Sequence, residues 1–163
     1  MTKLFAVAIA AAGFAASPAI AQDLGIEVGA TAPAVAVQSL DGKTVSLASY
    51  FGKQPVLIEF WATWCPNCRE LMPALLDAEK KYGSKVKFMA IAVAINQSPE
   101  KVRRWLAAHP LPHDTYYDVE GKAASAFDAP ATSYVVVLDK SGRVVYTGLG
   151  GKQDLEAALK KAL

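Results

Sequence analysis

Two cysteines at the junction of an apolar run and a helical pattern constrain this chain more than any other feature. Cys65 and Cys68 are the only cysteines in the 163 residues. Residues 55–61 predict a buried strand, and residues 67–82 repeat apolar side chains at helical spacing. A strand that delivers such a pair to a helix N-terminus builds a dithiol that opens and closes as a disulfide. The helix dipole favours a thiolate at Cys65, and Cys68 lies close enough to resolve a mixed disulfide.

Three other interpretations of the pair stay open. A zinc site needs about four ligands, and the only other imidazole or thiol ligands are His109 and His113, in a different context. A structural disulfide is the second alternative, although so short a loop contributes little by chain entropy. Two unrelated buried thiols are the third, which the Pro66-Asn67 turn between them disfavours. The pattern favours a redox-active pair and predicts neither a metal nor a cofactor.

The N-terminal segment has the pattern of an export signal. A lysine near the start is followed by an alanine-rich apolar stretch and by a small-X-small site that ends at Ala21. We therefore expect residues 1–21 to be a cleavable signal peptide and residues 22–163 to form one domain in the periplasm. An uncleaved membrane anchor over residues 4–21, with the domain facing the periplasm, is the alternative.

Composition narrows the class of function. The net charge of the full chain is only +2, which argues against nucleic-acid binding and against strong attraction to a membrane surface. A secreted scaffold held by disulfides would carry four or more cysteines, and a chain of this length builds a hydrophobic core without them. No repeat or linker divides the sequence, and we expect a monomer.

The pattern of elements along the chain predicts an α/β sandwich around a mixed sheet. Residues 114–118 are interpreted as a loop that edges the active-site groove. The expected strands are a hairpin over residues 34–47 and runs at 55–61, 86–95, 134–138 and 143–146. The expected helices are residues 67–82, a helix that Ser98 caps and Pro110 ends, residues 121–127, and a last helix with Leu155, Leu159 and Leu163 on one side.

The segment from Phe60 to Cys68, with Pro73 five residues after the second cysteine, resembles the thioredoxin fold. The preceding hairpin and a long insertion before the last strands resemble the exported TlpA-like thiol–disulfide reductases, over about residues 26–163. This resemblance implies a three-layer α/β sandwich in which helices flank a mixed central sheet, with a β-hairpin at the N-terminus.

The resemblance also implies roles for the residues around the dithiol. Cys65 would be the attacking thiolate and Cys68 the resolving thiol. Trp64 would pack beside the sulfur as the usual aromatic neighbour. Pro66 and Asn67 would tune the thiolate and thus the reduction potential.

Glu59 stands six residues before Cys65, where thioredoxins place a buried acid. Our hypothesis is that Glu59, with a pKa raised by desolvation, takes the proton from Cys68 during resolution. The alternative is a glutamate at the end of a strand that is turned towards solvent. The apolar residues on both sides of Glu59 favour the buried position.

The sequence departs from the family pattern at two positions. The family places a cis-proline opposite the dithiol, just before its third core strand, and here that position is Ser133. Either Pro130 takes the role in a rearranged loop, or Thr132 and Ser133 form the facing wall with a trans peptide bond. Many relatives also carry an acid three residues after the second cysteine, where this chain has Leu71.

The resulting hypothesis is an exported oxidoreductase that reduces protein disulfides. A thiol electron-donor protein, usually membrane-bound in this family, would restore the dithiol. Compatible substrates include apocytochrome c during cytochrome c maturation, an oxidase assembly factor and misoxidised proteins in general. Two alternatives stay open: a disulfide oxidase or isomerase with the same chemistry, and a copper chaperone that uses Cys65, Cys68 and a histidine.

Overall fold

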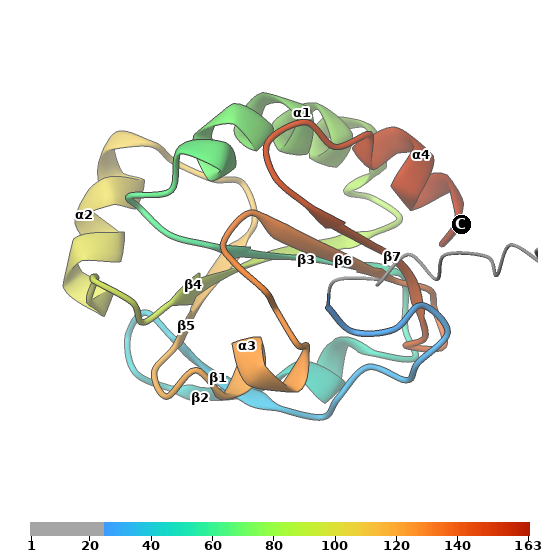
Figure 1. Ribbon diagram of the computed structural model, residues 1–163, viewed down its shortest axis with the longest axis horizontal. Helices are drawn as coiled ribbons and strands as arrows, with labels where there is room; N and C mark the ends of the chain where they lie inside the picture. The colour runs from blue at the N-terminus through green and yellow to red at the C-terminus, as the bar shows by residue number, and fades with distance from the viewer. Residues whose placement is uncertain (1–24) are drawn as a thin grey trace, which may run out of the picture.

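The computed structural model describes residues 25–163 and confirms the three-layer α/β sandwich (Figure 1). Seven strands form one sheet: β1 (Ala36–Ser39), β2 (Thr44–Ser46), β3 (Val56–Trp61), β4 (Lys87–Val93), β5 (Asp114–Asp118), β6 (Tyr134–Leu138) and β7 (Val144–Leu149). A 3-10 turn η1 (Leu47–Tyr50) and four helices connect them: α1 (Pro66–Tyr82), α2 (Pro99–Ala108), α3 (Lys122–Ala126) and α4 (Leu155–Lys160). The expected signal peptide and the start of the domain at residue 22 lie outside the described residues.

The sheet is mixed, with the strand order β2-β1-β5-β4-β3-β6-β7. Strands β3, β4 and β5 are parallel, and α1 and α2 provide the crossovers that parallel neighbours require. The expected N-terminal hairpin is present as antiparallel β1 and β2. Strand β6 is antiparallel to β3, and β7 is antiparallel to β6. The carboxyl ends of the parallel strands share one edge of the sheet, and the cysteine segment follows β3 at this edge.

Helices cover both faces of the sheet. Figure 1 shows α1 and α4 along one face, α3 against the opposite face, and α2 at the side of β4 and β5. The apolar stripe of α1 is buried as its spacing predicts, and it packs on side chains of the central strands. The buried residues that α1 and strands β3, β4 and β6 contribute to this layer include Leu71, Leu75, Ala78, Tyr82, Leu57, Phe88, Val135 and Val137.

The expectation that residues 114–118 form a loop is wrong, because these residues are strand β5 in the interior of the sheet. Tyr116 and Tyr117 are both buried, and aromatic side chains favour strands. The aspartates at the two ends, Asp114 and Asp118, hide this preference in the sequence. Strand β5 forms because β1 and β4 lie beside it, which no local pattern reveals.

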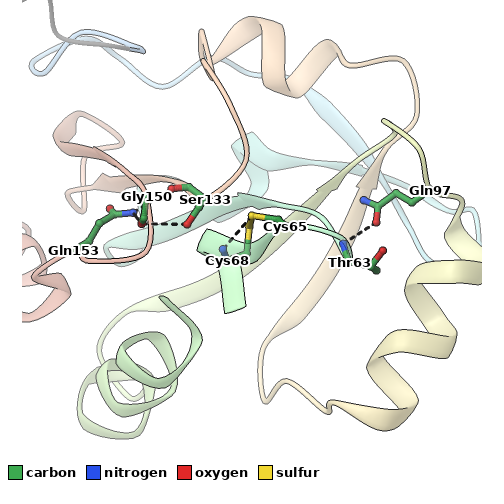
Figure 2. Close-up of a disulfide and its surroundings, with 7 residues drawn as sticks. All are labelled: Thr63, Cys65, Cys68, Gln97, Ser133, Gly150 and Gln153. Carbon is green, nitrogen blue, oxygen red and sulfur yellow. Dashed lines mark hydrogen bonds between the residues drawn. A yellow bond between two sulfur atoms is a disulfide. The ribbon is translucent and has the colours of Figure 1, made fainter. Parts of the chain in front are cut away.

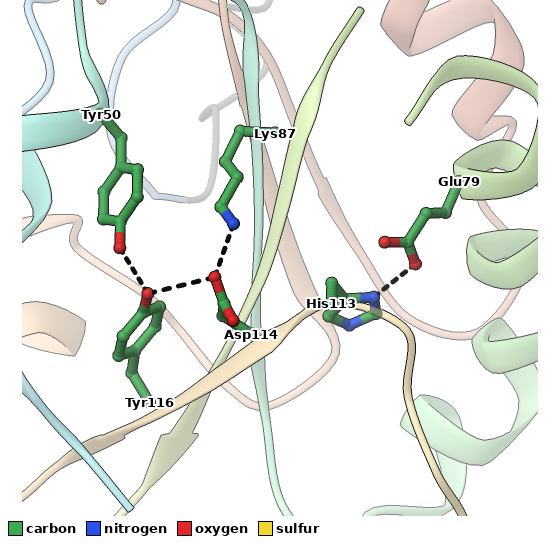
Figure 3. Close-up of polar contacts among 6 residues, drawn as sticks. All are labelled: Tyr50, Glu79, Lys87, His113, Asp114 and Tyr116. Carbon is green, nitrogen blue, oxygen red and sulfur yellow. Dashed lines mark hydrogen bonds and ion pairs between the residues drawn. The ribbon is translucent and has the colours of Figure 1, made fainter. Parts of the chain in front are cut away.

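Polar side chains tie the start of β5 to its neighbours (Figure 3). The Nδ1 atom of His113 lies 2.6 Å from the Oε2 atom of Glu79 on α1. Lys87, on β4, pairs with Asp114. The His113 ring is buried, whereas the Lys87–Asp114 pair is partly exposed. The buried pair therefore fixes α1 against the strand that the sequence analysis missed.

The C-terminal helix is shorter than expected. Leu155 and Leu159 are buried, but α4 ends at Lys160, and Leu163 is 58% exposed instead of facing the core. Strand β7 in turn runs further than its pattern indicates, to Leu149. Within residues 25–163, no helix combines the length and the apolar character that crossing a membrane requires.

Candidate active site

Cys65 and Cys68 lie where β3 leads into α1, and they form a disulfide with the sulfur atoms 2.15 Å apart. Cys65 is the N-cap of α1, and the backbone N–H of Cys68 donates a hydrogen bond to the Cys65 sulfur over 3.0 Å. The two cysteines are 1% and 3% exposed. The orphan N–H groups of a first helical turn favour negative charge, so this position stabilises a Cys65 thiolate once the disulfide is reduced.

The residues next to the cysteines are exposed. Pro66 and Asn67 occupy the first turn of α1, where proline suits the helix start because its missing N–H needs no partner there. Trp64 is 39% exposed, and its indole N–H donates to the carbonyl oxygen of Ile95 over 2.7 Å. The indole is thus held against the loop between β4 and α2.

Glu59 is buried in the middle of the sheet, with 5% of its surface exposed. It pairs in register with Ala90 on one side and Val135 on the other. Its Oε1 atom has no hydrogen-bond partner among residues 25–163. Burial without a compensating charge raises the pKa of Glu59 to about 8. The side chain is therefore not turned towards solvent, which was the alternative to a buried acid.

Ser133 occupies the position expected for a cis-proline, and its peptide bond is trans, as are all peptide bonds of residues 25–163. Its φ of 63° lies in the left-handed region, which is uncommon for a residue other than glycine. Ser133 is fully buried, Thr132 is partly buried and Pro130 is exposed. A trans Ser133, and no cis Pro130, therefore forms the loop before β6.

Two glutamines that the sequence analysis did not single out hold the loops around the disulfide (Figure 2). The Oε1 atom of Gln97 accepts a hydrogen bond from the backbone N–H of Thr63 over 2.9 Å. The Nε2 group of Gln153 donates to the carbonyl oxygens of Ser133 and Gly150, at 3.1 and 2.7 Å. No sequence signal marks them, because each acts on a segment that is distant along the chain.

A largely apolar groove of about 610 Å³ begins at Trp64. Its walls come from the loop after β4, from α3 with the turn before it, and from the segment that leads to Ser133. The lining residues include Trp64, Ile95, Val119, Ala124, Pro130 and Thr132. The structure thus brings two of the expected binding residues, Trp64 and Thr132, into one surface feature, whereas Pro66, Asn67 and Ser133 lie outside its lining.

The two histidines do not join the cysteines. His109 stacks on Trp105 with the ring centres 4.5 Å apart, and His113 pairs with Glu79. Within residues 25–163, the structure contains no group of three or more His, Cys, Asp or Glu side chains that could hold a metal ion. A copper site of Cys65, Cys68 and a histidine is therefore not assembled in this conformation.

Comparison with known proteins places the chain among thiol redox proteins. The Redoxin family model matches residues 27–163. The thioredoxin-like protein YneN of Bacillus subtilis is 30% identical over 141 residues, which cover 85% of this chain and 82% of that protein. The thiol-disulfide oxidoreductase ResA of Bacillus thuringiensis is 29% identical over 138 residues, which cover 83% of this chain and 79% of that protein.

A solved structure of a similar protein has the same fold. The solution structure of a candidate thioredoxin from Neisseria meningitidis superposes with a TM-score of 0.67 at 30% sequence identity. The superposition covers 79% of this chain and 85% of that one. The likeness therefore extends over the sheet and its helices and is not confined to the cysteine segment.

Proposed function

Because the chain belongs to the Redoxin family, we propose that it reduces disulfide bonds in exported proteins with Cys65 and Cys68 as its redox pair. It is a thiol–disulfide oxidoreductase of the thioredoxin fold with a Cys-X-X-Cys pair. The observation that carries the proposal is the disulfide at the N-terminus of α1, next to an apolar groove. Export rests on the signal-like pattern of residues 1–21.

The reaction is an exchange of two disulfides. The Cys65 thiolate attacks one sulfur of the partner disulfide, so that a mixed disulfide forms and the other partner sulfur leaves as a thiolate. The Cys68 thiolate then attacks the Cys65 sulfur and releases the first partner sulfur. Two electrons have passed from the dithiol to the partner, and the Cys65–Cys68 disulfide remains. A second thiol protein reverses these steps to restore the dithiol.

In its ionised form, Glu59 serves this scheme as the acceptor of the Cys68 proton. A carboxylate in an apolar interior binds a proton more tightly than one in water, and a pKa of about 8 brings Glu59 near that of a thiol. Its free Oε1 atom leaves an oxygen available for the transfer, directly or through a water. Replacement by glutamine should slow release of the mixed disulfide while leaving the first attack at Cys65 intact.

The apolar groove supplies a place for the partner. Exposed Trp64 and Ile95 offer apolar surface beside the disulfide, and exposed apolar surface of this kind marks sites of protein contact. Thr132, on the opposite wall, offers backbone groups to an extended segment. We assign to this groove the apolar residues that flank the partner cysteine. Trp64→Ala should then raise the KM for a protein disulfide more than that for a small disulfide.

The compartment and the partners follow from the direction of electron flow. An exported reductase works in an oxidising space, so it needs a thiol donor, and a membrane-bound thiol protein fits because it can draw electrons from inside the cell. Apocytochrome c is one substrate of suitable chemistry, as are other exported proteins with unwanted disulfides. We expect the protein to act as a monomer and to use no cofactor.

The equilibrium reduction potential of the Cys65–Cys68 pair tests the direction. A potential near or below about −230 mV in a glutathione series supports a reductase, because reducing proteins of the thioredoxin type lie in that range. A potential above about −150 mV overturns the proposal and identifies a disulfide oxidase with the same fold. A Cys65→Ser variant serves as the control that carries no redox pair.

A further inference from the structure

Two loops that approach the disulfide from different parts of the chain are each held by the side-chain amide of one glutamine. Figure 2 shows Gln97 and Gln153 on opposite sides of the Cys65–Cys68 bond. Gln97 belongs to the connection between β4 and α2, and Gln153 to the connection between β7 and α4. Each amide uses both its oxygen and its nitrogen in hydrogen bonds. Each is therefore built into the site and is not a solvated surface group.

Gln97 connects the segment before Cys65 to the central sheet. Its Oε1 atom accepts from the Thr63 N–H over 2.9 Å, and its Nε2 group donates to the carbonyl oxygen of Val93, the last residue of β4, over 2.6 Å. Its own carbonyl oxygen accepts from the Tyr117 hydroxyl over 2.6 Å. Gln97 is thus anchored by two strands and fixes the residue that lies two positions before Cys65.

The segment that Gln97 holds sets the position of the Cys65 sulfur. The N–H of Cys65 donates to the carbonyl oxygen of Ala62 over 3.1 Å, so residues 62–65 form a tight turn with Thr63 inside it. Closing a disulfide requires both sulfurs at bonding distance, and a preformed turn lowers the entropy lost on closure. The Gln97 bond is present in the disulfide form, and it favours this form to the extent that the turn loosens in the dithiol.

Gln153 holds the loop before β6 through its side-chain amide, as Gln97 holds the segment before Cys65. Its Nε2 group donates to the carbonyl oxygens of Ser133 and Gly150, and its Oε1 atom accepts from the Tyr146 hydroxyl over 3.1 Å. Ser133 and Gly150 also bond each other directly through backbone and side chain. This network supports Ser133 in its left-handed conformation without the rigidity of a proline. The preceding residue, Thr132, is left at the groove wall.

We propose that Gln97 and Gln153 are positioning residues with separate effects, Gln97 on the closure of the Cys65–Cys68 disulfide and Gln153 on the binding of the partner protein. The proposal rests on the proposed role of this disulfide in exchange with a protein partner. Neither glutamine touches the reacting sulfurs, so each acts through the backbone that it holds. The effects are separable because the two networks share no residue.

The test compares Gln97→Leu and Gln153→Leu with the wild-type enzyme and with Gln54→Leu. Gln54 precedes β3 at the end of the strand opposite to the disulfide, so its replacement controls for the loss of a glutamine as such. Three quantities are measured in each protein: the equilibrium constant of the Cys65–Cys68 pair with glutathione, kcat and KM with insulin as the protein disulfide, and amide hydrogen exchange.

For Gln97→Leu, we expect the equilibrium constant for disulfide formation to fall by about three- to tenfold, the range that corresponds to one hydrogen bond. The Thr63 amide should exchange faster, whereas the Ser133 amide, which bonds Phe60, should stay protected. An equilibrium constant within about twofold of both the wild type and Gln54→Leu overturns this half of the proposal. Should the leucine variant not fold, Gln97→Met gives the same test, because methionine keeps the length of the side chain and lacks the amide.

For Gln153→Leu, we expect KM for insulin to rise by about fivefold or more while kcat and the glutathione equilibrium stay at wild-type values. A variant that loses kcat instead, or keeps the wild-type KM, overturns this half. Failure of the proposed function would look different. In that case the wild-type enzyme would not reduce insulin at all, while the glutathione equilibrium and the Thr63 exchange would still decide the role of Gln97.

Discussion

The backbone N–H of Ser133 donates a hydrogen bond to the carbonyl oxygen of Phe60 over 2.8 Å. The bond joins the loop before β6 to β3 at the position where thioredoxin relatives are expected to have a cis-proline, which has no N–H to donate. This chain thus forms the loop before β6 with a donor that proline lacks. The backbone of Ser133 also takes a φ of 63°, far from the value of about −65° that a proline ring imposes.

Replacing Ser133 by proline should therefore destabilise the protein and not restore a missing family feature. We expect a loss of about 3 kcal/mol or more in the free energy of unfolding, measured in urea, from the lost bond to Phe60 and the incompatible φ. Ser133→Gly is the matched variant, because glycine tolerates positive φ. It should stay within about 1 kcal/mol of the wild type. Equal stability of the proline variant and the wild type would contradict this account.

Glu59 should make the stability of the protein fall as the pH rises. Burial raises its pKa in the folded state to about 8, above the ordinary value of 4.5 that applies to the unfolded chain. The folded state therefore holds a proton that the unfolded state releases. The contribution of Glu59 to stability is fully present below pH 4.5 and is lost as the pH rises towards 8. The loss across this window is on the order of a few kcal/mol.

The Glu59→Gln variant isolates this effect, because it keeps the size of the side chain and cannot ionise. Urea unfolding of both proteins through the same pH range should give curves that diverge, with the wild type losing more stability than the variant towards alkaline pH. All other titrating groups are common to both proteins and cancel in the difference. Parallel curves would show that Glu59 ionises as it does in water.

Asp118 should contribute more to the free energy of unfolding than an ordinary surface aspartate. Its two carboxylate oxygens accept hydrogen bonds from the N–H groups of Ala123 and Ala124, at 3.0 and 2.8 Å, and its side chain is buried. Asp118→Ala leaves these donors without a partner and should cost about 2–4 kcal/mol. The exposed Asp77→Ala change on α1 should stay within about 0.5 kcal/mol.

The same Asp118 variant should weaken the binding of a protein disulfide, since Ala124 and Gly121 line the groove. The measurement is the KM for insulin, together with amide exchange at Ala123 and Ala124. Faster exchange with an unchanged KM would separate the stability of α3 from the function of the groove, and would contradict the second part of the prediction.

The two polar pairs at the start of β5 should differ in how much each contributes to the free energy of unfolding. His113 is buried against Glu79, and His113→Ala removes a packed ring together with a hydrogen bond, which should cost about 2–4 kcal/mol. Lys87 pairs with the exposed Asp114, and Lys87→Ala should cost no more than about 1 kcal/mol because solvent screens the pair. Urea unfolding of the two variants measures both losses in the free energy of unfolding. A larger loss for Lys87→Ala than for His113→Ala would contradict this prediction.

The sequence alone determined the central layer of the fold and the identity of the redox pair. The strand before Cys65, the helix after it with its buried stripe, the N-terminal hairpin and the final strands all follow from local periodicity and turn residues. Glu59 was also found from the sequence, because it stands where the resemblance to thioredoxins implies a buried acid and because the residues on both sides of it are apolar. These features depend on neighbours in the chain, which the sequence displays directly.

Only the tertiary structure decided the setting of that pair. Strand β5 exists because β1 and β4 pair with it, and its own polar ends conceal it. The left-handed Ser133, and the glutamines that hold Thr63 and Ser133, depend on contacts between segments that lie about 20 or more residues apart. A sequence records which side chains are available for such contacts, but the packing of distant segments determines which of them meet. The chemistry of this protein is therefore evident from its cysteines, while their positioning depends on the fold.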